Sequence, residues 1–192
     1  MTNRHKYTKR FFDIILSFFL LIVIGWFILI LALVSVLVIR GSGFFKQSRI
    51  GQFGNAFTIY KIETLNRTSA KVSDFGGYLR KSKLDELPQL YNVLKGDMSF
   101  VGPRPDLSGF ADMLEGEDRL ILEVKPGLTG PASLHYLNEE VLLSRADNPE
   151  EYNRKVIWTK KVELNLAYVK QYSFRKDLYY LLKTILFPKL HD

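Results

Sequence analysis

One long apolar segment near the N-terminus limits what this chain can fold into. From Ile14 to Ile39 the sequence runs for 26 residues without a formal charge, and almost all of them are apolar. A helix needs about 20 apolar residues to cross a bilayer, and a buried core helix is seldom this uniformly apolar. A cleaved signal peptide is not expected, because the run exceeds the usual hydrophobic region of about 7–15 residues. The segment is therefore predicted to insert into a membrane.

The charges that flank this segment leave its topology open. Basic residues lie on both sides, at Arg4, Lys6, Lys9, Arg10, Arg40, Lys46 and Arg49. Because positive charge tends to stay on the cytoplasmic side, this pattern agrees with a helix that enters and leaves through the same leaflet. It also agrees with a spanning helix that has a weak charge bias. Gly25, midway along the segment, is the candidate for a break.

Composition narrows the classes of partner. The 192 residues suggest one ordinary domain plus the apolar segment. A formal net charge of +7 favours anionic partners such as lipid headgroups, nucleotides or phosphorylated substrates. Nucleic acid is not expected, because Lys and Arg are scattered and no nucleic-acid motif is present. The absence of cysteine excludes disulfides and thiolate metal sites.

An acidic pair, Asp85-Glu86, lies in the apolar frame Leu84 to Leu90. Cations surround it in the sequence, at Arg80, Lys81, Lys83, Lys95 and Arg104. Pro88 has no N–H, which is harmless only in the first turn of a helix, so a helix should start near Lys83–Asp85. That start would put the pair where backbone N–H groups attract a phosphate. In the alternative reading, Asp85 is only an N-cap.

The rest of the chain is read more coarsely. Strands are expected at 44–45 and 56–62 around a turn at 51–55, a loop at 66–77, and helices at 139–146 and 155–171. Lys61 either extends into a site or is a snorkelling surface lysine. An apolar stripe predicts a C-terminal amphipathic helix at about 177–189, which lies in a membrane interface or packs on the soluble core. The rigid loop 125–131 either approaches a ligand or simply makes turns.

Several segments, in this order, resemble the monotopic phosphoglycosyl transferases, which are bacterial sugar transferases that initiate glycan assembly on a polyprenol carrier. The resemblance covers nearly the whole chain, and its most specific part is Leu84 to Pro105. The matching segments are Lys9 to Asp13, Phe45 to Gly51, Phe57 to Lys61, Leu84 to Leu90, Asn92 to Pro105 and Lys125 to Gly130.

The resemblance implies an α+β, mainly helical fold. Residues 1–42 would form a membrane-inserted, re-entrant segment. Residues 43–192 would form a catalytic domain with a short β-hairpin and amphipathic interfacial helices. It also implies a location at the bacterial inner (cytoplasmic) membrane, with the catalytic domain on the cytoplasmic face. The implied partners are a UDP-sugar, polyprenyl phosphate and membrane lipids, and a homodimer is left open.

The resemblance further implies a mechanism. Asp85 matches the nucleophile, which attacks the β-phosphate of the UDP-sugar, releases UMP and forms a covalent phosphosugar–aspartate. Polyprenyl phosphate then attacks this intermediate. Asp85 also matches the position that contacts Mg²⁺, and Glu86 matches an assistant that activates the acceptor or helps with the metal. Phosphate oxygens are expected at Lys61, Arg80 and Arg104, and the nucleotide is expected at Pro126, Gly127 and Thr129.

The sequence departs from the family pattern in four places. Gly25-Trp26 takes the place of a Ser-Pro break, and Glu63 takes the place of an arginine. Lys83 lies where a small hydroxyl residue is common, and Pro131-Ala132-Ser133 replaces Trp-Ala-Gln. Because Glu63 is also compatible with lost activity, the alternative is a membrane-anchored binding or scaffold protein without catalysis.

Overall fold

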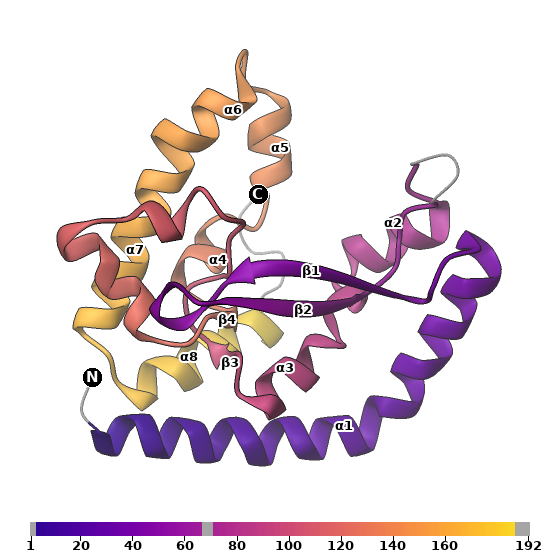
Figure 1. The fold of residues 1–192 in the computed structure, drawn as a ribbon, viewed down its shortest axis with the longest axis horizontal. Coiled ribbons are helices and arrows are strands. Elements are labelled where there is room, and N and C mark those ends of the chain that lie inside the picture. The colour runs from indigo at the N-terminus through magenta and orange to yellow at the C-terminus, as the bar shows by residue number, and fades with distance from the viewer. Residues whose placement is uncertain (1–2, 67–70, 187–192) are drawn as a thin grey trace. The chain divides into compact units, whose positions relative to one another are not determined.

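The computed structural model describes residues 3–66 and 71–186. The described chain is mainly helical, with a long apolar N-terminal helix and small two-stranded sheets, which confirms the coarse fold prediction (Figure 1). The chain divides into two compact units. We name them the hairpin unit (Phe11–Arg49 and Ala56–Met98) and the loop unit (Met1–Arg10, Ile50–Asn55 and Ser99–Asp192).

The N-terminal helix α1 (Asn3–Ile39) is the one described helix that is long and apolar enough to cross a bilayer. One of its faces contributes Ile28, Leu31 and Ala32 to a core with Ile62 and Leu79. The other face exposes large apolar side chains along its length, among them Phe11, Ile15, Phe18, Phe19, Ile22, Trp26, Leu29, Leu33 and Leu37. A helix that is apolar all round but covered on one face only needs an apolar solvent or partner on the other.

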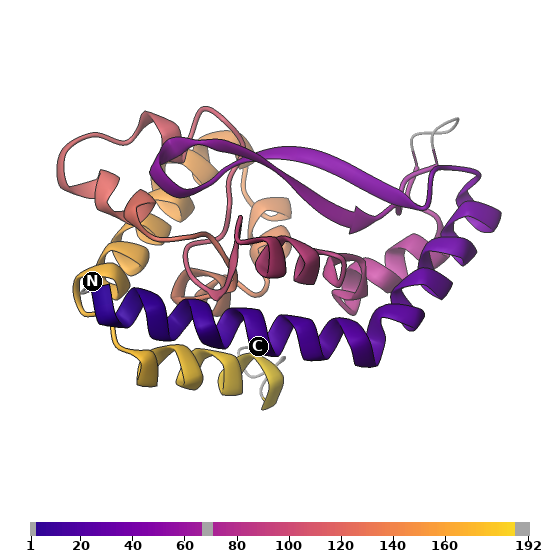
Figure 2. The same cartoon turned by 60° about the horizontal axis from the view of Figure 1, so that its bottom comes forward.

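The candidate break at Gly25 does not end α1. The helical assignment continues through Gly25 to Ile39, and the helix bends instead, as Figures 1 and 2 show. Without a proline no backbone N–H is lost, so the helix is free to continue. The Trp26 indole Nε1 donates a hydrogen bond to the Val23 carbonyl at 2.8 Å, which gives this carbonyl a side-chain partner.

The predicted hairpin is present. Its strands, apart from Ile50, belong to the hairpin unit, whereas its turn belongs to the loop unit. Strands β1 (Phe44–Ile50) and β2 (Ala56–Ile62) pair with each other, and the 3₁₀ turn η1 (Gln52–Gly54) joins them. The bounds of β2 are those predicted, whereas β1 is longer than the two residues expected. Part of the predicted loop at 66–77 is wrong, because helix α2 (Asp74–Lys81) begins there. The Ser73 side chain caps α2 by accepting from the Gly76 N–H at 3.0 Å, which offsets the two glycines in its first turns.

The acidic pair lies on a 3₁₀ turn, η2 (Leu84–Glu86), and not on an α-helix as predicted. The α-helix that follows, α3 (Gln89–Lys95), starts later, with Pro88 at its N-cap, and ends at Gly96. Lys83 explains the difference, because its left-handed backbone (φ 57°) separates this turn from α2. The argument from an α-helix N-terminus therefore does not apply to the pair. Leu90 and Val93 are buried as α3 packs, whereas Tyr91 is exposed.

The loop unit contains a parallel pair of short strands, β3 (Ser99–Val101) and β4 (Gly127–Thr129), in which Val101 lies opposite Thr129. Its shorter elements are the 3₁₀ turns η3 (Ala111–Met113) and η4 (Gly116–Glu123) and the helices α4 (Pro131–His135) and α5 (Glu139–Ser144). A longer helical run joins α6 (Pro149–Tyr152), the π-helical segment η5 (Asn153–Trp158) and α7 (Thr159–Lys170).

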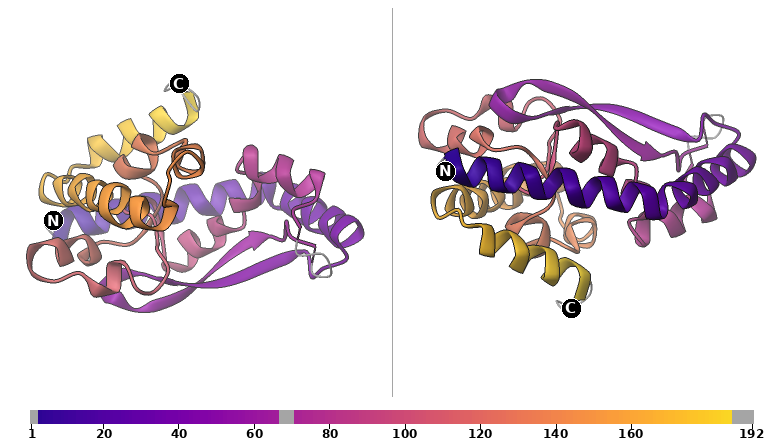
Figure 3. Two further views of the ribbon diagram at one scale, coloured as in Figure 1. Left: turned by 90° about the horizontal axis from the view of Figure 1, so that it is seen from above. Right: turned by 90° about the horizontal axis from the view of Figure 1, so that it is seen from below.

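The last described helix is α8 (Phe174–Leu186), drawn in yellow in Figures 2 and 3. It confirms the predicted C-terminal helix up to Leu186. The residues expected at its far end, Phe187 and Lys189, lie outside the described part of the chain. Exposed apolar side chains lie along α8 at Leu178, Leu182, Ile185 and Leu186, whereas Asp177 is buried.

Candidate active site

The hairpin unit brings together four of the predicted site residues. Lys61 on β2 reaches the acidic pair, and its Nζ lies 2.8 Å from Glu86 Oε1. Both side chains are mostly buried, so Lys61 is not the snorkelling surface lysine of the alternative reading. Arg80, near the end of α2, donates from Nε to Thr64 Oγ1 at 2.9 Å, which fixes its side chain beside the end of β2.

Asp85 is the more buried member of the acidic pair, with 6% of its surface exposed. Its Oδ1 atom is buried and has no hydrogen-bond partner among the described residues. Burial raises the pKa of the Asp85 carboxyl above its usual value of 3.8, and the neighbouring Glu86 raises it further, while Lys61, Lys83 and Arg80 lower it. A buried carboxylate that is weakly solvated and surrounded by cations is suited to attack a phosphoryl group.

Glu63, the position that departs from the family pattern, caps the turn that follows α1. Its Oε2 accepts from the Ser42 backbone N–H at 2.6 Å and from Ser42 Oγ at 3.0 Å. Its backbone carbonyl accepts from Ser35 Oγ on α1 at 2.7 Å. Gly41 packs directly against the carboxylate, and a Cβ at this position would collide with it. Glu63 lies two residues after Lys61 in the sequence. The end of β2 therefore contacts the acidic pair through Lys61, and the end of the apolar helix through Glu63.

Sequence reasoning missed two amides on α3. Asn92 is fully buried, and its side chain holds β2 by donating to the Thr58 carbonyl at 2.7 Å and accepting from the Tyr60 N–H at 3.2 Å. Gln89 is also buried, but its Nε2 has no hydrogen-bond partner among the described residues. Its position four residues after Asp85 was the signal that could have identified it. Asp97 has a structural role, since it pairs with Lys95 at 3.0 Å.

The other predicted site residues lie in the loop unit, around β3 and β4. Arg104 follows β3 and is exposed, whereas Pro126 and Gly127 are buried at the start of β4. The two loops pack backbone against backbone, because a Cβ at either Gly102 or Gly127 would collide with main-chain atoms of the facing loop. This explains why glycine is required in both segments.

Thr129, the third residue expected at the nucleotide, is held by α8. Its Oγ1 lies 2.7 Å from Thr184 Oγ1, and Thr184 also donates to the Tyr180 carbonyl at 2.8 Å. The side chain of Thr129 is therefore engaged with the C-terminal helix in this structure.

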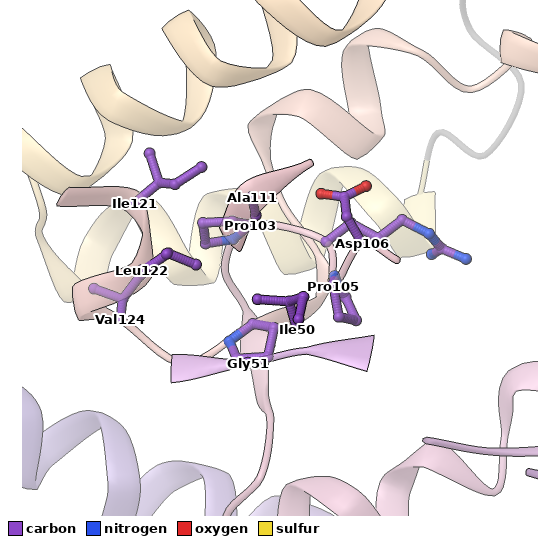
Figure 4. Close-up of a pocket in the computed structure, with 11 residues that line it drawn as sticks. Ile50, Gly51, Pro103, Pro105, Asp106, Ala111, Ile121, Leu122 and Val124 are labelled. Carbon is purple, nitrogen blue, oxygen red and sulfur yellow. The ribbon is translucent and has the colours of Figure 1, made fainter. Parts of the chain in front are cut away.

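A small hollow lies at the base of the loop that contains Arg104 (Figure 4). Its volume of about 20 Å³ is room for about one water molecule. Ile50, Pro105, Ile121, Leu122 and Val124 face it, and the Ile50 N–H donates to the Asp106 carbonyl at 2.9 Å. We interpret the hollow as an apolar seat for the Gly102–Pro105 loop, because it is too small for a nucleotide.

The donor set of the hairpin unit agrees with a metal ion shared with a substrate. Among the described residues, no group of three or more His, Cys, Asp or Glu side chains gathers in one place. Mg²⁺ does not need such a cage, because it is commonly held by one or two carboxylates together with substrate phosphates and water. The unpartnered Oδ1 of Asp85 is suited to be such a ligand.

Comparison with known proteins gives a consistent family. A family model described as bacterial sugar transferase matches residues 4–188. The uncharacterized sugar transferase EpsL of Bacillus subtilis is 37% identical, over 92% of this chain and 85% of its own length. A UDP-glucose:undecaprenyl-phosphate glucose-1-phosphate transferase of Klebsiella pneumoniae is 31% identical over 92% of this chain. A UDP-N-acetylgalactosamine-undecaprenyl-phosphate N-acetylgalactosaminephosphotransferase of Aeromonas hydrophila is 29% identical over 94% of it.

The relatives differ in length. The matched region spans most of EpsL, but only 39% of the Klebsiella protein and 43% of the Aeromonas protein. The names of the Klebsiella and Aeromonas proteins also differ in the sugar that is transferred.

Proposed function

Since this chain belongs to the bacterial sugar transferase family, and is thus a phosphoglycosyl transferase, we propose that it transfers a sugar-1-phosphate from a UDP-sugar to undecaprenyl phosphate. The supporting observation is the buried Asp85 carboxylate, whose Oδ1 is unpartnered among the described residues, beside the Lys61–Glu86 ion pair. The names of the Klebsiella and Aeromonas relatives support the acceptor and the class of donor. They do not agree on one sugar, so the sugar of this chain is left unassigned.

Asp85 acts as the nucleophile in two displacement steps. In the first, a carboxylate oxygen of Asp85 forms a bond to the β-phosphorus, the bond between this phosphorus and the bridging oxygen breaks, and UMP leaves. In the second, an oxygen of polyprenyl phosphate attacks the same phosphorus, and the Asp85 carboxylate leaves. Two displacements divide one difficult transfer into easier ones. The first step needs Asp85 ionised, and in the second step Asp85 leaves as a carboxylate. Lys61, Lys83 and Arg80 favour this ionised form, against the effects of burial and of Glu86.

The residues around Asp85 have separate roles. Lys61 holds Glu86 through its 2.8 Å ion pair and balances the charge of the acidic pair. Glu86 would then activate the acceptor phosphate or help to hold the metal ion. Arg80 lies beside the pair, and Arg104, in the loop unit, is exposed and able to contact phosphate oxygens. Mg²⁺, held by Asp85, would neutralise the negative charge that develops on the phosphate oxygens as the diphosphate breaks.

The proposed site lies at a membrane surface. The apolar face of α1 and the exposed stripe of α8 would both contact lipid. Both ends of α1 bind polar groups of the units: Lys9 pairs with Asp177 in the loop unit, and Ser35 donates to Glu63 in the hairpin unit. We propose that α1 re-enters through one leaflet, with the catalytic domain on the cytoplasmic face of the bacterial inner membrane. The basic residues on both flanks of the apolar run support this topology.

A direct assay tests the proposed reaction. Purified protein is incubated with Mg²⁺, undecaprenyl phosphate and a panel of UDP-sugars, and released UMP is measured. We expect UMP with at least one sugar, and a covalent phosphosugar adduct on the wild-type chain by mass spectrometry when the acceptor is omitted. Removal of Mg²⁺ with a chelator should abolish the signal. Release of UDP would indicate ordinary glycosyl transfer and contradict the proposal.

A matched pair of variants tests the nucleophile. Asp85→Asn should release no UMP and form no adduct, because the amide cannot attack phosphorus. Asp97→Asn is the control, since it makes the same chemical change in the same unit at a residue whose side chain meets Lys95 at 3.0 Å and Asn92 at 3.3 Å. Full activity of Asp85→Asn would exclude Asp85 as nucleophile.

The alternative of a scaffold without catalysis loses its main support, because Glu63 has a structural partner in Ser42.

A further inference from the structure

We propose that Gln89 is a further catalytic residue, whose side-chain N–H donates a hydrogen bond to an oxygen of the phosphoryl group transferred at Asp85. The inference rests on the proposed function, because it assigns a role within the same site. Only 3% of the Gln89 surface is exposed, and its Nε2 atom has no partner among the described residues. A buried amide in this state is the exception in folded proteins.

A second amide on the same helix shows what a structural role looks like. Asn92, three residues further on, is also buried, and its Nδ2 and Oδ1 both have main-chain partners on β2. Asn92 thus ties α3 to the strand that contains Lys61. Gln89 makes no such tie, although it is equally withdrawn from water. The contrast indicates that Gln89 is not retained for packing α3 against β2.

The position of Gln89 relates it to the nucleophile. The backbone winds in helical conformation from η2 through Leu87 and Pro88 into α3, so Gln89 follows Asp85 by about one turn. Each of these two side chains has a buried polar atom without a partner: an acceptor, Oδ1, on Asp85 and a donor, Nε2, on Gln89. A buried polar group without a partner destabilises the folded protein. A transferred phosphoryl group would relieve both, because its oxygen accepts from Nε2 and its phosphorus bonds to the Asp85 carboxylate.

The chemistry of the surroundings identifies the ligand. An N–H donor requires an acceptor, and the charges at Lys61, Lys83 and Arg80 favour an anionic one. A phosphoryl oxygen has both properties. As the phosphorus bonds to Asp85, an N–H group already fixed in a buried site stabilises charge on the oxygens of the transferred group without further reorganisation. The atoms of the reaction are unchanged by this contact, because Gln89 donates a hydrogen bond and transfers no proton.

The test compares three variants of the full-length chain in detergent or nanodiscs. Gln89→Met removes the donor and keeps the length of the side chain, and Gln89→Glu keeps its shape but replaces the donor with an acceptor. Asn92→Leu is the control for a structural amide, because it leaves the Thr58 carbonyl and the Tyr60 N–H without their partner. Thermal unfolding and the steady-state kinetics of UMP release are measured for each.

We expect Gln89→Met to lower kcat by about 10- to 100-fold, with a smaller change in KM, and to unfold at or above the wild-type temperature. Asn92→Leu should instead unfold at a clearly lower temperature. Gln89→Glu should be no more active than Gln89→Met, because it places a second acceptor against the phosphate. The proposal is overturned if Gln89→Met retains activity within about twofold of wild type, or if it is destabilised as Asn92→Leu is.

Failure of the proposed function gives a different result. If the wild-type chain releases no UMP with any UDP-sugar, that function is refuted independently of Gln89. The affinity of UDP, measured calorimetrically with Mg²⁺ in the wild type and in Gln89→Met, then decides the role of the amide. Weaker binding in the variant supports a phosphate contact, and equal binding overturns it.

Discussion

The Lys9 ammonium lies 2.6 Å from Asp177 Oδ2, and both side chains are buried in the loop unit. Tyr172 and Tyr168 donate to the same carboxylate, at 3.0 Å to Oδ2 and 2.6 Å to Oδ1. This arrangement ties the first turns of α1 to α7 and α8, as Figure 2 allows the reader to follow. It satisfies a buried charge on α8 with a cation that precedes the apolar segment, and it fixes the N-terminal end of that segment.

Removing one partner of this buried pair should destabilise the protein strongly. Asp177→Leu leaves the Lys9 ammonium and two tyrosine hydroxyls without their acceptor. We therefore expect the free energy of unfolding to fall by about 3–5 kcal/mol. Asp177→Asn, which keeps an acceptor for the tyrosines, should lose less. In the double variant Lys9→Met with Asp177→Asn, the loss should be smaller than the sum of the single losses. Chemical unfolding in detergent measures this, and strict additivity would show that the pair is not coupled.

The raised pKa of Asp85 predicts opposite effects of pH on stability and on activity. A carboxyl whose folded-state pKa lies above its unfolded value of 3.8 stabilises the fold when protonated, and this contribution is lost as pH rises through the folded-state pKa. Asp85→Asn should therefore raise the unfolding temperature at neutral pH, and the difference should vanish below about pH 3.8. Thermal unfolding from pH 3 to pH 8 tests this, and a less stable variant at neutral pH would contradict it.

The pH dependence of catalysis follows from the same carboxyl. Asp85 must be ionised to attack phosphorus, so UMP release should fall as pH falls through a value above 3.8. Lys83→Gly removes a nearby cation and also suits the left-handed backbone at this position, where φ is 57°. We expect this variant to shift the acid limb to higher pH without loss of stability, whereas Lys83→Arg should leave the limb in place.

Glu63 should be needed for both stability and activity in this chain, although the family usually has arginine at this position. Glu63→Arg removes the acceptor of the Ser42 N–H and Oγ and forces a longer side chain against Gly41. We expect the free energy of unfolding to fall by about 1.5–3 kcal/mol, the usual contribution of hydrogen bonds to a charged group. UMP release should be lost as well, because β2 shifts. Glu63→Gln, which keeps one acceptor oxygen, is the control. A stable, active Glu63→Arg would show that the turn after α1 has no effect on the site.

Single cysteines should place both ends of α1 on the same side of the membrane. The chain contains no cysteine, so each introduced thiol is the only one present. Lys6→Cys and Ser48→Cys are suitable because both positions are exposed and lie outside the apolar run. Ser42 is a less suitable position, because its N–H donates to the Glu63 carboxylate. An impermeant thiol reagent should label both variants from the cytoplasmic side, and labelling from opposite sides would establish a spanning helix.

The sequence by itself determined the elements whose cause is local. The uncharged run from Ile14 to Ile39 requires an apolar helix, the alternation in Ala56–Ile62 gives a strand with the observed bounds, and the stripe around Leu178 gives an amphipathic helix. The motif around Asp85 gave the family and the acidic pair, because that pattern of residue types is specific in itself. These features depend on periodicity and chemistry within a few residues of one another.

Only the tertiary structure decided which residues meet. Lys61 pairs with Glu86 because β2 packs on η2, and the pairing of β3 with β4 joins two loops that no periodicity predicted. Lys83 has a left-handed backbone conformation, and α3 starts at Gln89 and not at Lys83–Asp85. No residue pattern near Lys83 predicted this conformation. Packing also distinguishes two amides on the same helix. Asn92 has hydrogen-bond partners on β2, whereas the Nε2 atom of Gln89 has none among the described residues.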